Sequence, residues 1–218
     1  MKYTAFLLLI LGLGAFLRFF LLTGVPPSLS HDEVAIGYNA YSILKTGRDE
    51  YGQQFPLLFR SFDDYKLPGM IYATVPSIAV WGLNEFGVRF PSALFGTIAI
   101  FIFYGIASTL LRNEKNSLGR YAPLVLTLFF AISPWHINFS RQSFESNGAL
   151  LFFMIGTYFL LQCERKNTLL IPSAIFYALS VYFYYSVRPV LPIVLLIFCF
   201  IYKDVLLRKL KITVAAGV

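Results

Sequence analysis

Charged residues are scarce in this sequence. Only 13% of its 218 residues are Asp, Glu, Lys or Arg, whereas 57% are hydrophobic and 18% are aromatic, and the mean hydropathy is +0.67. A soluble core of this length cannot bury so much apolar surface. The composition therefore excludes a soluble globular domain and predicts an all-α, polytopic integral membrane protein in contact with the lipid bilayer.

Cysteine, acidic residues and repeats are also rare or missing. Cys163 and Cys199 lie at or inside apolar segments without a CxxC spacing, so the sequence implies neither a disulfide framework nor a zinc site. The 18 basic residues outnumber the 11 acids, but they form short clusters between apolar runs, as in a membrane-spanning chain. Nucleic acid is therefore not an expected partner. No repeat of 20 to 50 residues is present.

The apolar runs predict about six transmembrane helices. Residues 1–22 hold a run of the length that a bilayer needs, and no A-x-A-like cleavage site follows, so we expect an uncleaved first helix with its amino end inside. The other predicted spans are residues 88–111, 121–138, 146–162, 168–186 and 189–203. Because a new apolar run is cut short at Val218, residues 1–218 are expected to be the amino-terminal part of a protein whose carboxyl-terminal part is missing.

Residues 67–84 are apolar but short, and Pro76 interrupts them. If this segment does not cross the membrane, the three later clusters of Lys and Arg all lie inside with Lys2, as the positive-inside rule requires. If it crosses, those clusters all lie outside. The segment is therefore predicted to be an interfacial or re-entrant helix at the end of an extracytoplasmic loop, residues 23–87.

The predicted outer loop contains an amphipathic helix over residues 32–46, with Ser30 or His31 as its cap. The apolar face of this helix consists of Val34, Tyr38, Tyr41 and Leu44. Such a helix is expected to lie along the membrane surface.

Three polar groups share the predicted outer face. They are Asp32 with Glu33, then Asp63, Asp64 and Lys66, and finally Arg141 with Glu145. Carboxylates and cations at a membrane surface suit a reaction in which an acceptor hydroxyl loses its proton and a phosphate leaves. Taken singly, such loop residues are more often only solvated. Arg18, near the outer end of the first helix, either reaches the lipid headgroups or contacts an anionic group.

The order of these motifs resembles a known family. Four motifs follow one another as in GT-C glycosyltransferases, over roughly residues 1–190. They are the Asp-Glu pair, the acid-rich stretch ending in Lys66 and Pro68, N-E-F-G-V-R-F-P-S-A-L-F-G and S-P-W-H-I-N-F-S-R-x-x-x-E. The chain is most similar to the branch with protein O-mannosyltransferases, lipid A aminoarabinose transferases and lipopolysaccharide-core galacturonosyltransferases. The resemblance implies an inverting enzyme that moves a sugar from a polyprenyl-phosphate donor to a lipid, glycan or protein acceptor at the extracytoplasmic face of the cell membrane.

The resemblance also implies roles for single residues. The family's catalytic base falls on Asp32, with Glu33 as its neighbour. The Lys that contacts the donor phosphate falls on Lys66, and Arg18 or Arg141 assists it. The supporting acids fall on Asp63, Asp64 and Glu145. The sequence departs from the pattern at Tyr65, where the family has an acid, and at Leu67, where it has a second Pro. Because some relatives use a divalent metal ion, a metal between His31, Asp32 and Glu33 stays open as an alternative to no cofactor.

Two other functions stay open. A transporter or flippase of lipid-linked sugars would carry ionisable residues at mid-membrane or paired broken helices, whereas the predicted spans are nearly free of charge except for Arg18. A non-catalytic assembly subunit fits the expected loss of the carboxyl-terminal part. His136 beside Trp135 is expected to anchor a helix end at the membrane interface.

The charge pattern predicts the location of two loops. A reporter fused after Lys115 should be cytoplasmic, and a reporter inserted near Gly52 should be external, because residues 67–84 are predicted not to cross. If both reporters lie on the same side, residues 67–84 cross the membrane and the shared outer face does not exist.

Overall fold

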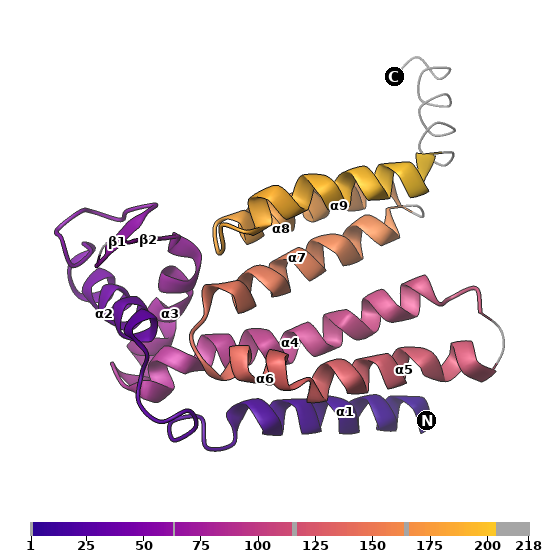
Figure 1. Ribbon diagram of the computed structural model, residues 1–218, viewed down its shortest axis with the longest axis horizontal. Coiled ribbons are helices and arrows are strands. Elements are labelled where there is room, and N and C mark those ends of the chain that lie inside the picture. Colours follow the sequence, from indigo (N-terminus) through magenta and orange to yellow (C-terminus); the bar gives the residue numbers. More distant parts are fainter. Residues whose placement is uncertain (1, 63, 115–116, 164–165, 204–218) are drawn as a thin grey trace, which may run out of the picture.

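The computed structural model describes residues 2–62, 64–114, 117–163 and 166–203 (Figure 1). The chain is mostly helical, as predicted. In chain order its elements are α1 (Lys2–Phe19), α2 (His31–Thr46), β1 (Phe59–Ser61), β2 (Asp64–Lys66), α3 (Pro68–Trp81), α4 (Glu85–Leu110), α5 (Ser117–Ile132), α6 (Pro134–Arg141), α7 (Glu145–Gln162), the 3-10 turn η1 (Asn167–Leu169), α8 (Leu170–Val181) and α9 (Val187–Ile201).

Helix α4 is the element on which the others assemble. It contacts α1 and α5 on one side and α7 on the other, and α6 packs near its amino end (Figure 1). Helix α7 carries α8, which in turn contacts α9. Helices α2 and α3 and the β1–β2 hairpin gather at one end of this bundle (Figure 1). The outer-loop residues therefore form one compact unit on the ends of the long helices.

The six predicted spans are not all long single helices. Among the described residues, only α4 is long and apolar enough to cross a membrane by itself. A second such unit exists if Gly119–Ile132 and Pro134–Arg141, bent by 53°, count as one span. The predicted span 121–138 is thus wrong as a single helix, because Pro134 has no N–H to continue the α5 ladder and starts α6 instead. The count of six stays a prediction.

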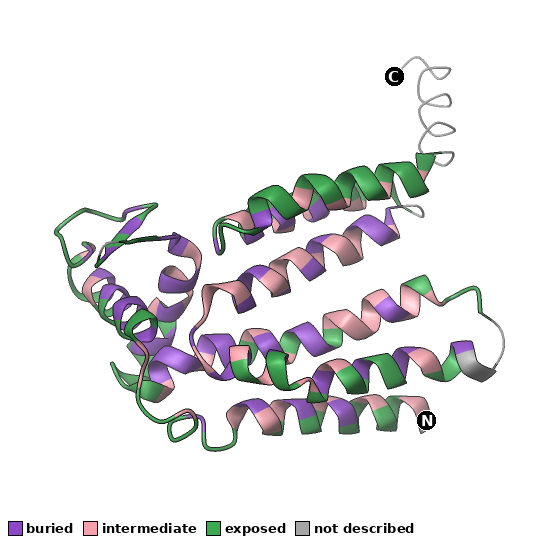
Figure 2. Ribbon diagram, in the orientation of Figure 1, coloured by how far each residue is buried: buried purple, intermediate pink, exposed green. Residues whose placement is uncertain are grey.

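Many large apolar side chains point away from the bundle. The exposed residues cover much of α9 and the outer faces of α1 and α5 (Figure 2). Examples are Leu9, 68% exposed, Phe129, 66% exposed, and Phe200, 74% exposed. Apolar surface on this scale needs an apolar surrounding. It agrees with the membrane environment that the composition predicts.

Helix α2 forms where the sequence predicts it, and it carries a second apolar face that packs against the protein. Its cap is Ser30, whose hydroxyl accepts from the N–H of Glu33 while the Glu33 side chain accepts from the N–H of Ser30. The buried face carries Ile36, Ala40 and Ile43. The face predicted to be apolar, Val34, Tyr38, Tyr41 and Leu44, is exposed. That face therefore stays available for the membrane surface, as the amphipathic pattern predicts.

The β1–β2 hairpin is the part of the fold that the all-α prediction missed. Phe59 pairs with Lys66 and Ser61 with Asp64 in an antiparallel register. Residues directly opposite one another project from the same face. Phe59 is buried against the protein, so its partner Lys66 is turned inward as well.

Phe183 joins the outer unit to the helices. It belongs to the core cluster that contains Met70 of α3 and Ala149 of α7. Its ring lies against Gly69 of α3 and Gly148 of α7, where an added Cβ would collide with ring atoms. Two glycines thus provide the space in which this one aromatic ring packs.

Gly148→Ala should therefore destabilise the protein by about 1–3 kcal/mol, because the Phe183 ring has to shift in a packed core. Gly12→Ala is the matched control, since a Cβ at this helical glycine meets no atom within 4 Å. The measurement is thermal unfolding in detergent. Equal melting temperatures for the two variants would contradict the packing of Phe183 described above.

Candidate functional site

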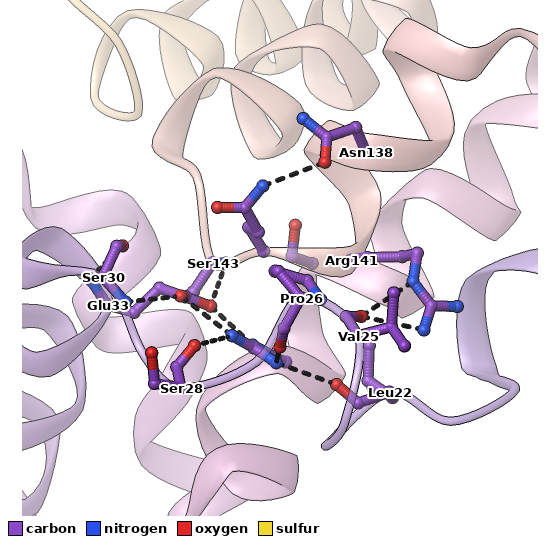
Figure 3. A network of polar contacts seen from close by, with 12 residues as sticks. Leu22, Val25, Pro26, Ser28, Ser30, Glu33, Asn138, Arg141 and Ser143 are labelled. Carbon is purple, nitrogen blue, oxygen red and sulfur yellow. Dashed lines mark hydrogen bonds and ion pairs between the residues drawn. The ribbon is translucent and has the colours of Figure 1, made fainter.

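A buried ion pair lies under the amino end of α2. The Arg89 Nε donates to Glu33 Oε1 at 2.8 Å, and both side chains are almost fully buried. Glu33 also accepts from the backbone N–H groups of Ser30 and Ser143 (Figure 3). The Glu33 carboxylate is therefore held by α2, α4 and the turn before α7 at once.

Arg89 has further partners in the loop that follows α1. Its guanidinium donates to the carbonyl oxygens of Leu22, Pro26 and Ser28 (Figure 3). These carbonyls lie in irregular backbone and have no helical N–H to accept from. The sequence groups Glu33 with Asp32 as catalytic, but this geometry favours a structural role for Glu33, because its oxygens are engaged by four N–H donors.

Arg141 fixes the same loop from the other side. Its guanidinium donates to the carbonyl oxygens of Leu17, Leu21 and Val25 at 2.8 to 3.0 Å. These bonds hold the end of α1 against the end of α6. A phosphate at Arg141 would have to share N–H donors that already bind backbone carbonyl oxygens.

Arg18 does not reach the lipid headgroups, so the first of the two expectations for this residue is wrong. It is fully buried, and it donates to the carbonyl oxygens of Gly14 and Ala131 and contacts His136 Nδ1 at 2.6 Å. The expectation that His136 anchors a helix end at the interface is also wrong. His136 is only 1% exposed and its ring stacks on Phe130. Both side chains tie α1 to α5 and α6 inside the bundle.

The structure brings Asp32 and Lys66 together. Lys66 Nζ lies 2.7 Å from Asp32 Oδ1, across 34 residues of sequence. The lysine side chain is only 7% exposed, whereas the aspartate side chain is 55% exposed. Asp32 lies in the first turn of α2, where the helix dipole favours a negative charge. In this pair the carboxylate of Asp32 is therefore accessible to solvent, whereas the ammonium group of Lys66 is buried.

Glu145 belongs to the same site. It is the first residue of α7 and precedes the predicted span 146–162. Burial raises the pKa of Glu145 to about 7, the positive charge of Lys66 opposes this rise, and the negative charges of Asp32 and Asp64 add to it. Its Oε1 atom is buried without a hydrogen-bond partner among the described residues. A second acid that can hold a proton thus lies near enough to the Asp32–Lys66 pair for their charges to change its pKa.

The other predicted acids contribute less. Asp64 accepts from the N–H of Tyr65 and is exposed on the hairpin. Asp63 lies outside the described residues. Among the described residues, no three His, Cys, Asp or Glu side chains are grouped so that they could hold a metal ion. The set His31, Asp32 and Glu33 does not fit a metal, because the Glu33 carboxylate is bound to Arg89.

Arg89 is the functional-site residue that the sequence analysis missed. It lies in the motif N-E-F-G-V-R-F-P, in the second turn of an otherwise apolar helix. A buried Arg needs acceptors for its donors, often a carboxylate, so its place in an apolar run was the available signal. The identity of the partner, 56 residues earlier, has no signal in the sequence.

The comparisons with known proteins give one match. The family model described as dolichyl-phosphate-mannose-protein mannosyltransferase matches residues 67–218. This segment covers more than half of the chain and contains Arg89, Arg141 and Glu145, whereas Asp32 and Lys66 precede it. No curated protein and no solved structure matches the chain.

Arg89→Met should lower the free energy of unfolding by about 3–5 kcal/mol, because it leaves the buried Glu33 charge without its partner. Arg60→Met, at an exposed arginine of the hairpin, should change it by less than about 0.5 kcal/mol. Adding Glu33→Gln to Arg89→Met should recover part of the loss, since the unpaired charge is gone. Thermal or denaturant unfolding in detergent measures all three, and a double variant no more stable than Arg89→Met would contradict the pairing.

Glu145 should make stability depend on pH. Its pKa is raised in the folded protein, so the folded state keeps a proton that the unfolded chain releases, and stability falls as the pH rises from about 4.5 to about 7. Glu145→Gln should therefore melt at a higher temperature than the wild type at about pH 8 and at a similar temperature at about pH 4.5. Glu85→Gln, an exposed carboxylate in the first turn of α4, is the matched control. A melting difference that does not vary with pH would refute the buried, protonated Glu145.

Proposed function

The chain belongs to the dolichyl-phosphate-mannose-protein mannosyltransferase family, and from this membership we propose that it transfers a sugar from a polyprenyl-phosphate donor to a hydroxyl of a lipid, glycan or protein acceptor. The family is one of membrane glycosyltransferases. The observation that carries the proposal is the ion pair of 2.7 Å between Lys66 and Asp32, with Glu145 beside it.

In the proposed reaction Asp32 is the general base. Its exposed carboxylate takes the proton of the acceptor hydroxyl while the acceptor oxygen attacks the anomeric carbon of the donor sugar. The bond between that carbon and the phosphate oxygen breaks, and the polyprenyl phosphate leaves with the electron pair. Because attack and departure occur on opposite faces of the sugar, the configuration inverts.

Lys66 has two partners in turn in this reaction. In the free protein its ammonium group binds Asp32. When the donor arrives, the ammonium group turns to the phosphate and stabilises the charge that develops on it, and Asp32 becomes free to accept the proton. Glu145, which can hold a proton near pH 7, donates a hydrogen bond to the phosphate or the sugar.

An apolar groove supports a lipid-linked donor. A cavity of about 180 Å³ lies between the start of α7 and the start of α9, and its lining includes Ser146, Ala149, Phe153, Tyr184 and Val190. Ser146 follows Glu145 directly, so a chain in this groove ends beside the proposed phosphate position. The aromatic segment 182–185 thus contributes to the groove as well as to packing.

The proposed active face is extracytoplasmic, in a multi-pass chain with six crossings. Helices α2 and α3 lie at one end of the bundle (Figure 1). The helix ends and connections at the opposite end carry the basic residues Lys2, Arg112, Arg120 and Lys166. By the positive-inside rule the basic end is cytoplasmic, which puts Asp32 and Lys66 outside.

Asp32→Asn should lower sugar transfer by about 10²–10⁴-fold, because the amide cannot take the proton. Lys66→Met keeps most of the apolar stem but removes the charge, and should lower transfer by about 10²–10³-fold. The measurement is transfer of radiolabelled sugar from polyprenyl phosphate in membranes that contain each variant of the full-length protein.

Two matched variants test whether these losses are specific. Glu85→Gln and Lys45→Met remove exposed charges outside the site, and they should transfer at the wild-type rate. Transfer by Asp32→Asn at the wild-type rate would remove the base from the mechanism. An unchanged rate for Lys66→Met would leave Lys66 with only the Asp32 contact.

A transporter of lipid-linked sugars is the second candidate function. Two observations favour it, the 53° break between α5 and α6 and the buried Arg18 inside the bundle. However, only one such bent pair occurs among the described residues, and the Arg18 guanidinium binds backbone carbonyls of α1 and α5. Movement of the lipid-linked sugar across membranes without sugar transfer would favour this second function.

A further inference from the structure

A second groove lies far from the Asp32–Lys66 pair, between α1 and α5. It has a volume of about 340 Å³. Its walls are apolar, with Phe6, Leu9 and Leu13 from α1 and Leu124, Val125 and Leu128 from α5. Leu9 is 68% exposed and Val125 48%, so the groove opens outward and does not belong to the core.

The length of the groove indicates what fits it. From Phe6 to Leu13 the axis of α1 rises about 10 Å, and one leaflet of a bilayer core is about 15 Å thick. The groove is therefore shorter than one leaflet is thick. A crossing helix of a partner would need a surface about 30 Å long, whereas one acyl chain fits within a single leaflet.

The end of the groove beyond Phe6 is polar and positive. The rings of Tyr3 and Tyr121 pack there with centroids 5.2 Å apart, and the exposed Arg120 directly precedes Tyr121 in the chain. The described residues that line the groove include no Asp or Glu. Glu114 and Arg120 both line a neighbouring cavity, between α4 and α5.

We propose that this groove is a binding site for one anionic phospholipid, with an acyl chain between α1 and α5 and its phosphate at Arg120, Tyr3 and Tyr121. The charge and hydroxyl groups at one end and the apolar walls along the rest match the two parts of such a lipid. This site is separate from the proposed transfer of sugar, and it does not depend on that function.

Native mass spectrometry of the purified full chain in detergent tests the proposal. The probes are phosphatidylglycerol and phosphatidylcholine with the same acyl chains. The wild type should retain phosphatidylglycerol better, and Arg120→Gln should reduce that retention about fivefold, toward the level of phosphatidylcholine, as expected for one cation at a membrane surface. Arg60→Gln, an exposed arginine of the hairpin, is the matched control and should change nothing.

A second variant tests the acyl-chain part. Leu9→Trp fills the groove from an exposed position without disturbing the core, and it should reduce the retention of both lipids. Leu196→Trp, on the exposed face of α9, should not. Equal retention of the two lipids by the wild type would overturn the proposal. If inorganic phosphate displaces the lipid and Leu9→Trp has no effect, the site binds free phosphate and the proposal is overturned. If the protein forms dimers without lipid and Leu9→Trp abolishes them, the groove is an interface between two copies and the proposal is overturned as well.

Discussion

The buried ion pair between Glu33 and Arg89 determines the geometry of the site around Asp32 and Lys66. Neighbouring residues on an α-helix point about 100° apart, so fixing Glu33 inward sets the rotation of α2 and turns Asp32 outward. The 55% exposure of the Asp32 side chain is thus a consequence of the full burial of its neighbour. Asp32 then meets Lys66 because Phe59, the hairpin partner of Lys66, is buried and turns that lysine inward. A residue without a catalytic contact therefore positions the residue proposed to act as the base.

Three arginines stabilise the irregular backbone around this pair. Arg18, Arg89 and Arg141 each donate to carbonyl oxygens, and together these carbonyls lie along the end of α1, the loop to α2 and the end of α5. The carbonyls of Leu22, Pro26 and Ser28 lie in irregular backbone, and leaving such a group unpaired in a buried place costs about 1–3 kcal/mol. A buried ion pair gives little net stability over an apolar pair of equal size. What Arg89 adds is specificity, since its fork of donors fits only one arrangement of α2, α4 and the loop.

The sequence predicted the helices better than their orientation. The Ser30 to Glu33 capping box is a local pattern, and α2 begins within one residue of the prediction. The sequence could not show which face of α2 packs against the protein, because two apolar stripes, one with Tyr38 and one with Ile36, are both compatible with a helical period, and the choice depends on Arg89, 56 residues away. The strands of the hairpin have three residues each, too few to show an alternating pattern. Of the site, the sequence identified Asp32, Lys66 and Glu145, which the structure brings together, but it could not show that Arg141 binds carbonyls.

The contact between Lys66 and Asp32 bears on how the proposed enzyme avoids hydrolysing its donor. In the free protein Asp32 is bound to the ammonium group of Lys66, so the uptake of a proton from a hydroxyl has to break this ion pair. Only a second anion at Lys66 can replace Asp32 without leaving a buried charge uncompensated, and in the proposed reaction that anion is the donor phosphate. Base and leaving group thus compete for one cation. In the proposed reaction the base is released when the donor is in place, so activation of a water molecule in the empty site would be disfavoured by the same contact that prepares the reaction.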